Sequence, residues 1–469
     1  MRLCRRLLLL VLVACILSAC AESPSDTAAT EGAASLPGTR GPIAIENVTV
    51  VPMDRERTMP GQTVVIQAGQ IATVGEAGTV EVPDGATRVD GSGQFLMPGL
   101  AEMHAHLPVH DEPAGFRDAV LHLFALNGVT FARGMQGGPD HPPLRDAIAA
   151  GERFGPTLRV SGPFMSGSID SPDSARGLVQ AYHETGYDLL KIGEGLSPEV
   201  YAAIVDEARS LDMPFAGHVA DDVGLVRSLE AGQRTVDHFD NYLEAMRTED
   251  APTDYGAIFG VLDLVPHLDR DRMDELVAAT EAAGTGNVPT MVLWDLFFAD
   301  RPAEEYRSAR PEVRYMPPGI VDQWTSAVAN MREDRDPERG QAVIALRNEL
   351  LQAYAESDAP LLLGSDAPQI FNVPGFSLHR EMQYMQDEAG MTPYDVLVSG
   401  TRAIAEFYGE SDTFGTVQEG RRADLILVNG NPLDDVAHAS DMAGMVVRGR
   451  WLDADEIQSR LDELAAQWE

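Results

Sequence analysis

Cysteine is almost absent from this chain of 469 residues. Its three cysteines, Cys4, Cys15 and Cys20, all lie within the first twenty residues. The rest of the sequence therefore has no disulfide bond, no cysteine-ligated metal and no catalytic thiol. Stability and chemistry beyond residue 20 must come from other side chains.

Lysine is rarer still, because Lys191 is the only one and the other 34 of the 35 basic residues are arginine. Arginine supplies charge and ion pairs equally well, so these roles do not explain the exception. Lysine is needed where an amine must act as a neutral nucleophile, and burial lowers its pKa enough to provide one. Such an amine can add carbon dioxide to give a carbamate, whose two oxygens suit a bridge between two cations. The alternative is a buried lysine in a structural ion pair.

Positive charge as a whole is scarce, with 73 acidic residues against 35 basic ones and a net charge of −38. A surface this acidic repels nucleic acid and anionic membranes, which argues against both as partners. The charge suits a salty or exposed environment, but we interpret it as a source of solubility alone.

The N-terminus has the composition of a targeting signal. Arginines precede the apolar run LLLLVLVACIL, and the segment ends in LSAC at Cys20. This pattern predicts a secretory signal over residues 1–20, since the run is too short to span a bilayer comfortably. The ending resembles the bacterial lipoprotein box, in which Cys20 would be lipidated and become the first mature residue. The alternative is an ordinary cleaved signal with an incidental cysteine.

A lipidated Cys20 implies an exported, periplasmic lipoprotein held at the membrane by its acyl chains. Ala21 follows the cysteine, which is similar to lipoproteins sorted to the outer membrane of Gram-negative bacteria. Residues 21–40 are small and polar with proline and glycine, which predicts a flexible tether.

Two blocks rich in Val, Ile and Thr flank the long middle of the chain. Residues 41–96 contain AIENVTVVPM and TVVIQAGQIATVGE, and residues 406–469 contain RADLILVNGNPL and MAGMVVRGRWLD. These patterns predict short strands broken at glycine turns. We therefore expect a small β-sandwich built from both ends of the chain, with a terminal amphipathic helix over residues 455–468.

Residues 97–405 alternate short apolar runs with helical stretches, which predicts an α/β fold with a parallel sheet. The expected strands are GVTFARGM, TLRVSGPF, DLLKIGE, PFAGHVA, RTVDHFD, VPTMVLW and APLLLGSDA; the expected helices include SPEVYAAIVDEARSLDM and DDVGLVRSLEAGQ. No glycine-rich phosphate loop follows an early strand, as an open doubly wound sheet would need. A (β/α)₈ TIM barrel is the better interpretation.

Histidines stand at the expected strand ends. His104 and His106, in MPGLAEMHAH, are two residues apart and would share one face of a strand. His218, in GHV, and His238, in VDHF, are separated by 20 residues, which is enough for one helix and its turns. Neutral imidazole is a common metal ligand. Each of these histidines taken alone could equally be a hydrogen-bonded core residue.

Asp366 completes the set at the end of LLLGSDA. An apolar strand ending in Gly-Ser-Asp would place this carboxylate at the barrel mouth, where it could bind metal and act as a general base. The other interpretation is an N-cap of the following helix.

His-x-His followed by Lys, His, His and Asp resembles the amidohydrolase superfamily, most closely its imidazolonepropionase-like and prolidase-like branch. The resemblance covers nearly all of the mature chain, and residues 399–403 and 415–425 look like that branch's closing signature. It implies two divalent metals, with zinc the default and manganese or cobalt as alternatives. In that arrangement His104, His106 and Asp366 bind the more buried metal, His218 and His238 bind the exposed one, and carboxylated Lys191 bridges them.

Lys191 also separates the activities within that branch, because imidazolonepropionase uses one metal and lacks the bridging lysine. The resemblance is therefore to the two-metal members, which cleave amide bonds of dipeptides or N-acyl compounds. It implies that a metal-bridging hydroxide attacks the carbonyl while Asp366 accepts and then donates the proton. The alternatives are lactone or phosphoester hydrolysis at the same centre, or a non-catalytic lipoprotein that binds a small ligand at the barrel mouth.

Two further residues are candidates for substrate contact. Tyr242 follows His238 closely and would either reach the substrate or pack a helix. His379 would either support the site or take a surface or capping role. Residues 295–345 are expected to form an insertion over the active site, and nothing in the sequence indicates the oligomeric state.

Overall fold

The computed structural model describes residues 36–110, 113–252, 260–332 and 336–469. Residues 37–469 form one compact unit. The predicted signal peptide, with Cys20, and most of the predicted tether lie outside the described residues. Among the helices that the structure describes, none has the length and apolar character needed to cross a bilayer.

Seven named strands and one further segment run parallel around a barrel. The first sheet contains β7 (Leu100–Ala105), β8 (Val129–Gly134) and β9 (Thr157–Val160). The second contains β10 (Leu190–Ile192), β11 (Phe215–Gly217), β12 (Thr235–Asp237) and β13 (Gly286–Val288). A parallel bridge from Ser161 to Leu189 joins the two sheets.

Residues 361–367, which lie within the expected strand APLLLGSDA (residues 359–367), close the barrel as its eighth member. Asn287 pairs with Leu361 on one side, and Ala105 pairs with Ala367 on the other. The amide of Met103 also donates to the carbonyl of Leu363 at 2.9 Å. The predicted (β/α)₈ architecture is thereby confirmed.

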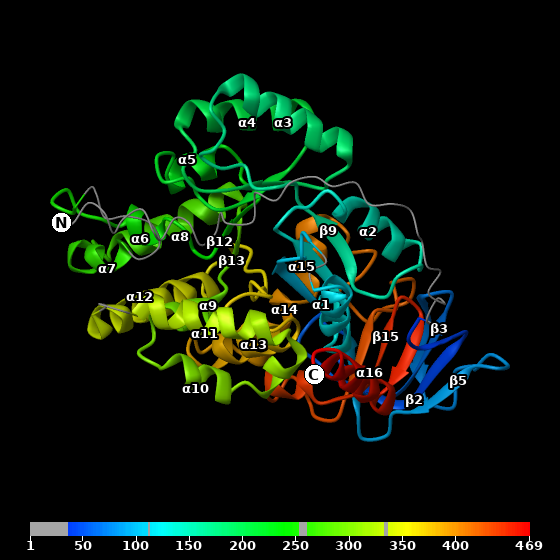
Figure 1. The fold of residues 1–469 in the computed structure, drawn as a ribbon. Helices are drawn as coiled ribbons and strands as arrows, with labels where there is room; N and C mark the ends of the chain where they lie inside the picture. Colours follow the sequence, from blue (N-terminus) through cyan, green and yellow to red (C-terminus); the bar gives the residue numbers. More distant parts are fainter. Residues whose placement is uncertain (1–35, 111–112, 253–259, 333–335) are drawn as a thin grey trace. The chain divides into compact units, whose positions relative to one another are not determined.

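Helices follow the strands in chain order (Figure 1). They are α1 (Phe116–Leu126), α2 (His141–Ala149), α3 (Pro172–Thr185), α4 (Pro198–Ser210), α5 (Leu225–Glu230), α6 (Tyr242–Ala245), α7 (Val261–Leu264), η2 (Val265–His267) and α8 (Arg272–Ala283). After β13 come α9 (Met291–Phe298), α10 (Ala303–Ser308), η3 (Pro311–Tyr315), α11 (Pro318–Arg332), α12 (Pro337–Ala355), α13 (Phe376–Asp387), α14 (Pro393–Ser399) and α15 (Arg402–Tyr408).

Local sequence sets the starts of α3 and α4. The hydroxyl of Ser171 accepts from the amide of Ser174, and that of Ser197 accepts from Val200, with proline at the next position in both helices. A serine cap satisfies a free amide of the first turn, and proline loses no hydrogen bond there.

The expected strand VPTMVLW is wrong beyond its first residue, because β13 ends at Val288 and α9 begins at Met291. Nearly every side chain of α9 is buried, and a short buried apolar run has no periodicity to distinguish helix from strand. The deciding contact comes from far along the chain. Glu381 accepts hydrogen bonds from the amides of Met291 and Val292 at 2.7 and 2.8 Å and thereby caps the helix.

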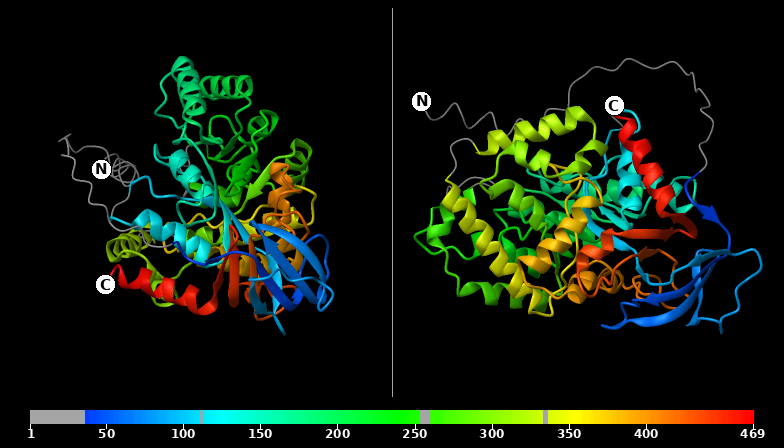
Figure 2. Two further views of the ribbon diagram at one scale, coloured as in Figure 1. Left: turned by 90° about the vertical axis from the view of Figure 1, so that its right-hand side faces the viewer. Right: turned by 90° about the horizontal axis from the view of Figure 1, so that it is seen from below.

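Both ends of the chain build one nine-stranded sheet, with their strands side by side in Figure 2. Its strands are β1 (Thr39–Arg40), β2 (Ile43–Val50), β3 (Met59–Gln67), β4 (Gln70–Glu76), β5 (Thr87–Asp90), β6 (Phe95–Pro98), β14 (Leu425–Val428), β15 (Met442–Val447) and β16 (Arg450–Asp453). The order is β1-β16-β15-β14-β6-β2-β3-β4, with β5 also on β2. An antiparallel bridge from Gln70 to Arg422 brings the β4 edge back to the segment before β14.

The C-terminal part also contains η4 (Val436–Ser440) and α16 (Ala454–Ala466), which matches the expected terminal helix. The predicted tether is too long at its C-terminal end. Thr39 and Arg40 pair with β16, and the amide of Gly38 donates to Glu456 Oε1 at 2.8 Å. Backbone pairing with a distant strand has no signal in this small, polar sequence.

Candidate metal centre

The six predicted ligands lie at one end of the barrel. His104 is in β7 and Lys191 is in β10, whereas His106, His218 and His238 each follow a strand directly. Asp366 lies in the closing segment. The carboxyl ends of parallel barrel strands meet at one face, which is the face that carries active sites in this fold.

Distances between these side chains show that they converge. Lys191 Nζ lies 3.3 Å from His104 Nε2. Asp366 Oδ1 lies 3.0 Å from His106 Nε2, and Asp366 Oδ2 lies 3.7 Å from His238 Nδ1. The His238 and His218 ring centroids are 5.0 Å apart. The structure thus brings the chain's sole lysine into direct contact with His104, which lies among the other predicted histidines.

The chemistry of this donor set fits divalent cations. Ligand atoms of His104, His238 and Asp366 lie within 4.8 Å of one another. Burial lowers the pKa of His106 to about 3 and the pKa values of His104 and His238 well below their usual value. These imidazoles are therefore neutral and have the lone pair that a metal needs.

Asp366 fits the same purpose. Its Oδ1 is buried, and no described residue gives it a hydrogen bond of normal geometry. Burial raises the pKa of Asp366 to about 7, because the loss of solvation outweighs the attraction of Lys191 and His218 for the carboxylate. A cation among the imidazoles would compensate it.

Lys191 occupies a closed pocket. Its side chain is fully buried, and burial lowers the pKa of its amine. The Phe164 ring centroid lies 5.5 Å from Nζ. Gly217 makes the room for the lysine stem, because a Cβ there would stand 2.6 Å from Lys191 Cδ at a φ of +118°. The glycine before His218 is thus a requirement of the lysine pocket.

Asp237 is a buried residue that the sequence analysis missed. Its Oδ2 lies 2.9 Å from His104 Nδ1 and 3.7 Å from Lys191 Nζ, and its Oδ1 accepts from Arg133 at 3.1 Å and from Thr235 at 2.7 Å. Burial would raise the pKa of Asp237, but Arg133 and His104 hold it well below its usual value. Lys191 is thus within ion-pair distance of Asp237, but Arg133 and His104 contribute more than Lys191 to keeping this carboxylate charged.

Other side chains orient the remaining imidazoles. Asp240 Oδ2 lies 2.6 Å from His218 Nδ1, and Thr290 Oγ1 lies 2.8 Å from His238 Nδ1. The contact of Asp237 with His104 Nδ1 leaves Nε2 facing Lys191. Such outer contacts fix the tautomer and ring orientation of metal-binding histidines. Asp237 and Asp240 stand within two residues of His238, which is the one sequence signal that could have revealed them.

Backbone strain collects at the same place. His238, Thr290 and Asp366 have φ values of +63°, +48° and +62°. Left-handed backbone is unusual for residues other than glycine, persists only where surrounding contacts enforce it, and clusters at functional sites. Here the amide of His238 donates to the carbonyl of Val288 at 2.7 Å, and Arg347 donates to the carbonyl of His238.

Glu102 holds Asp366 at the end of its strand. It accepts from the amides of His104 and Ser365, both at 2.9 Å, and from the Ser365 hydroxyl at 2.5 Å. A Cβ at Gly364 would stand 2.5 Å from Val288 Cγ1, so only glycine allows this approach. The Gly-Ser-Asp motif therefore locks the first strand to the last.

The structure corrects the expectation that Tyr242 contacts substrate. Tyr242 is fully buried in α6, and its hydroxyl bonds to Thr280 Oγ1 at 2.6 Å and to the Tyr354 hydroxyl. A phenol with both hydrogen-bonding roles used inside the protein has none left for a ligand. The helix-packing alternative is the correct one.

His379 also lies away from the metal centre. Its Nε2 lies 2.9 Å from the carbonyl oxygen of Asn127, which precedes β8 and therefore stands at the opposite end of the barrel. The proximity of His379 to Asp366 in sequence was misleading, because α13 already lies against Asn127 where it begins, at Gly375.

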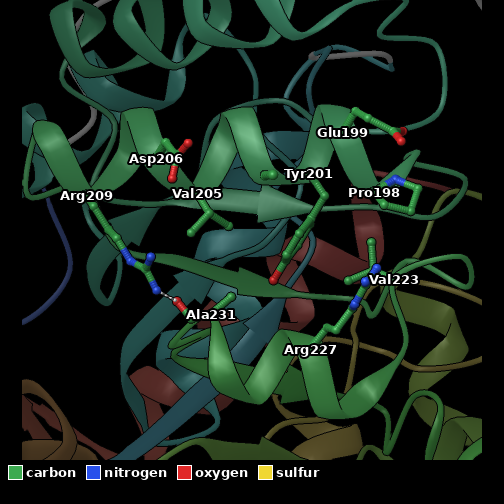
Figure 3. A pocket seen from close by; sticks show the side chains of 10 residues that line it. Pro198, Glu199, Tyr201, Val205, Asp206, Arg209, Val223, Arg227 and Ala231 are labelled. Atoms are coloured by element: carbon green, nitrogen blue, oxygen red, sulfur yellow. Dashed lines mark hydrogen bonds between the residues drawn. The ribbon is translucent and has the colours of Figure 1, made fainter.

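A surface cavity of about 430 Å³ lies between α4 and α5, on the outside of the barrel (Figure 3). Tyr201, Arg209 and Arg227 are among its lining residues, and Arg209 donates to the carbonyl of Ala231 at 2.8 Å. None of the six predicted ligands lines it. The cavity is therefore separate from the candidate metal centre.

Comparison with known proteins places this geometry in a family context. The model of the amidohydrolase family matches residues 95–452. No curated protein sequence matches the chain.

Several solved structures are similar to residues across nearly the whole chain. Bottromycin amidohydrolase has a TM-score of 0.71 and 22% identity over 91% of this chain and 90% of its own. A Xaa-Pro dipeptidase with methionine in its active site has a TM-score of 0.65 and 18% identity over 88% of this chain and 100% of its own. The A. niger ochratoxinase has a TM-score of 0.63 and 17% identity over 88% and 96%. At these identities the likeness shows a shared fold.

Proposed function

Because the chain belongs to the amidohydrolase family, whose members are hydrolases of carbon–nitrogen bonds, we propose that it hydrolyses the amide or peptide-like bond of a dipeptide or N-acyl amino acid. The observation that carries the proposal is the contact between the only lysine and His104, within a group of four histidines and Asp366. The similar structures include a Xaa-Pro dipeptidase and a prolidase complexed with N-methylphosphonate-L-proline.

We propose that two divalent cations bind here. His104, His106 and Asp366 would hold one, His218 and His238 would hold the other, and a carbamate on Lys191 would bridge them. Zinc is the expected metal for a histidine-rich site, with manganese or cobalt as alternatives. When bound, such cations supply an acidified water and a polarised substrate carbonyl.

The protein's own residues would move the proton. Asp366 has one buried oxygen without a hydrogen bond from any described residue, and burial raises its pKa to about 7. A carboxylate beside the reacting centre can accept a proton from the attacking water and return it to the departing amine. Asp237 would keep His104 Nε2 available by holding Nδ1.

The test is a screen of the purified chain against matched substrates. These are dipeptides and N-acyl amino acids, with lactones and phosphoesters carrying similar side groups as the comparison. We expect hydrolysis of the amides, loss of that activity on treatment with a chelator, and its recovery with zinc, manganese or cobalt. Hydrolysis of lactones or phosphoesters without any amide hydrolysis would contradict the proposal.

We also propose that the chain is exported and anchored through a lipid on Cys20. The support is the LSAC sequence after a basic and apolar N-terminus. When the cells are grown with a labelled fatty acid, the wild-type chain should incorporate the label. The Cys20→Ala variant should not incorporate it and should be found in the soluble fraction. An unlabelled wild-type chain would contradict the anchor.

A further inference from the structure

Phe164 is an exposed aromatic residue beside the candidate metal centre. Its side chain is 38% exposed, and no other aromatic residue in the described ranges is as open to solvent. The Phe164 ring centroid lies 6.1 Å from that of His218, with the ring planes 23° apart. The chain thus leaves one aromatic ring uncovered next to a predicted metal ligand.

The Phe164 ring stands on the side of the centre that solvent can reach. The side chains of His218 and His106 are 18% and 17% exposed. The other predicted ligands are at most 5% exposed. A substrate therefore reaches the centre on the side of His106 and His218, where the Phe164 ring lies.

Backbone hydrogen bonds fix the segment that carries Phe164. The amide of Met165 donates to the carbonyl of Lys191 at 2.9 Å, and the amide of Gly193 donates to the carbonyl of Met165 at 2.8 Å. A parallel bridge also joins Met165 to Ile192. Phe164 is thereby attached to β10, the strand that carries the lysine. An aromatic side chain on a fixed backbone loses little conformational entropy when a ligand packs against it.

Lys191 covers only part of the Phe164 side chain. Its Nζ lies over the ring, 5.5 Å from the centroid, and is itself fully buried. The exposed part of the phenylalanine is what remains after that contact. Exposed apolar surface is a source of binding free energy, because a ligand group that covers it removes it from water. The ring can therefore make a second contact, with a ligand, while it keeps the first.

A substrate bound at the metals would bring its side chains to this ring. The two Cα atoms that flank a trans amide are about 3.8 Å apart, so the side chains next to the scissile bond begin close to it. The distance of 6.1 Å between the Phe164 and His218 centroids is within the reach of such a side chain. Two aromatic rings in contact gain stabilisation beyond the area that they bury.

We propose that Phe164 binds an apolar side chain of the substrate, aromatic by preference, that flanks the scissile amide. This assignment rests on the proposed amidohydrolase function. It narrows the substrate class from dipeptides and N-acyl amino acids in general to those with a bulky apolar group beside the bond that is cut. Phe164 thereby sets specificity and takes no part in the proton transfer.

The first test compares the dipeptides Phe-Ala, Ala-Phe and Ala-Ala on the metal-loaded full chain. At least one of the phenylalanine dipeptides should have a KM about tenfold or more below that of Ala-Ala, as expected for the burial of one aromatic side chain. The dipeptide that shows the preference tells whether the side chain lies on the acyl or the amine side. In Phe164→Ala most of the preference should disappear, while kcat and KM on Ala-Ala stay unchanged.

Val226→Ala is the matched control. Val226 is 48% exposed on α5, and its neighbour Arg227 lines the cavity on the outside of the barrel. Removing this exposed apolar side chain should leave the preference of the wild type intact. A wild-type chain without any preference for a phenylalanine dipeptide would overturn the assignment, as would an equal loss of activity on all the dipeptides in Phe164→Ala.

Metal content separates substrate binding from a role in covering Lys191. If the ring only shields the lysine, Phe164→Ala should lose metal and act less well on every dipeptide alike. Phe164→Leu keeps an apolar cover over the lysine but removes the aromatic ring. Full metal content in Phe164→Leu with a reduced preference for the phenylalanine dipeptide supports the assignment, even if Phe164→Ala loses metal. The wild-type preference in Phe164→Leu and Phe164→Ala would overturn it.

The second test does not require turnover. Titration calorimetry would compare the same dipeptides on the metal-loaded Asp366→Asn chain, with and without Phe164→Ala. Tighter binding of a phenylalanine dipeptide than of Ala-Ala, lost with Phe164→Ala, supports the assignment even if the wild type hydrolyses no amide, in which case only the proposed reaction fails. Amide hydrolysis with the same preference in Phe164→Ala and the wild type would overturn the assignment and leave the reaction standing.

Discussion

The two ends of the barrel use buried histidine differently. His104 at the mouth is fully buried and His379 at the other end is partly buried, and burial lowers the pKa of both imidazoles. His379 Nε2 bonds to a backbone carbonyl at 2.9 Å, whereas His104 Nε2 faces the amine of Lys191 at 3.3 Å. Burial and a neutral ring are therefore not enough to mark a functional histidine. What distinguishes the functional histidine is that its Nε2 faces another candidate metal ligand and not a backbone carbonyl.

The largest expected effect comes from Asp366 at the mouth. Asp366→Asn keeps the shape of the side chain but removes its ability to take a proton, so kcat should fall by about 10²–10⁴. The Tm and the metal content should stay close to those of the wild type. Steady-state kinetics and metal analysis check this, and undiminished kcat would assign the proton transfer to another group.

A smaller effect is expected at Asp237, which contacts His104 from inside the barrel. Asp237→Asn weakens the contact that holds His104 Nδ1 and leaves Arg133 without its carboxylate. We expect metal affinity to fall about 10–100-fold, as is typical when the partner of a ligating histidine is lost. Competition with a chromogenic chelator measures this change. An unchanged affinity would mean that Asp237 serves the fold alone.

The smallest effect is expected at the other end of the barrel, where a substitution should change stability but not catalysis. His379→Ala removes a hydrogen bond to the carbonyl of Asn127, so the free energy of unfolding should fall by about 1–3 kcal/mol. The kcat and KM values should not change. Thermal or denaturant unfolding and kinetics together check this, and a loss of activity at full stability would erase the contrast between the two ends.

Much of the mouth could be predicted from sequence, because strand ends in a barrel converge by topology. His104, His218, His238 and Asp366 each end an apolar run, so their meeting required only the fold. Lys191 was visible as the single lysine. These signals are local, and each is read within about ten residues.

The errors have the opposite cause, since they concern contacts between distant segments. The stop of β13 and the start of α9 depend on Glu381, some ninety residues later. Tyr242 and His379 are close in sequence to ligands, but their bonds to Thr280 and Asn127 turn them away from the site.

The most direct test of the metal centre is the metal content of the purified chain beside that of Lys191→Arg. Arginine keeps the positive charge but cannot form a carbamate, and every other basic residue of the chain is already arginine. We predict about two divalent cations per wild-type chain and loss of bound metal in Lys191→Arg, with partial recovery in Lys191→Ala on addition of acetate. Full metal content in Lys191→Arg would contradict a bridging role for the lysine.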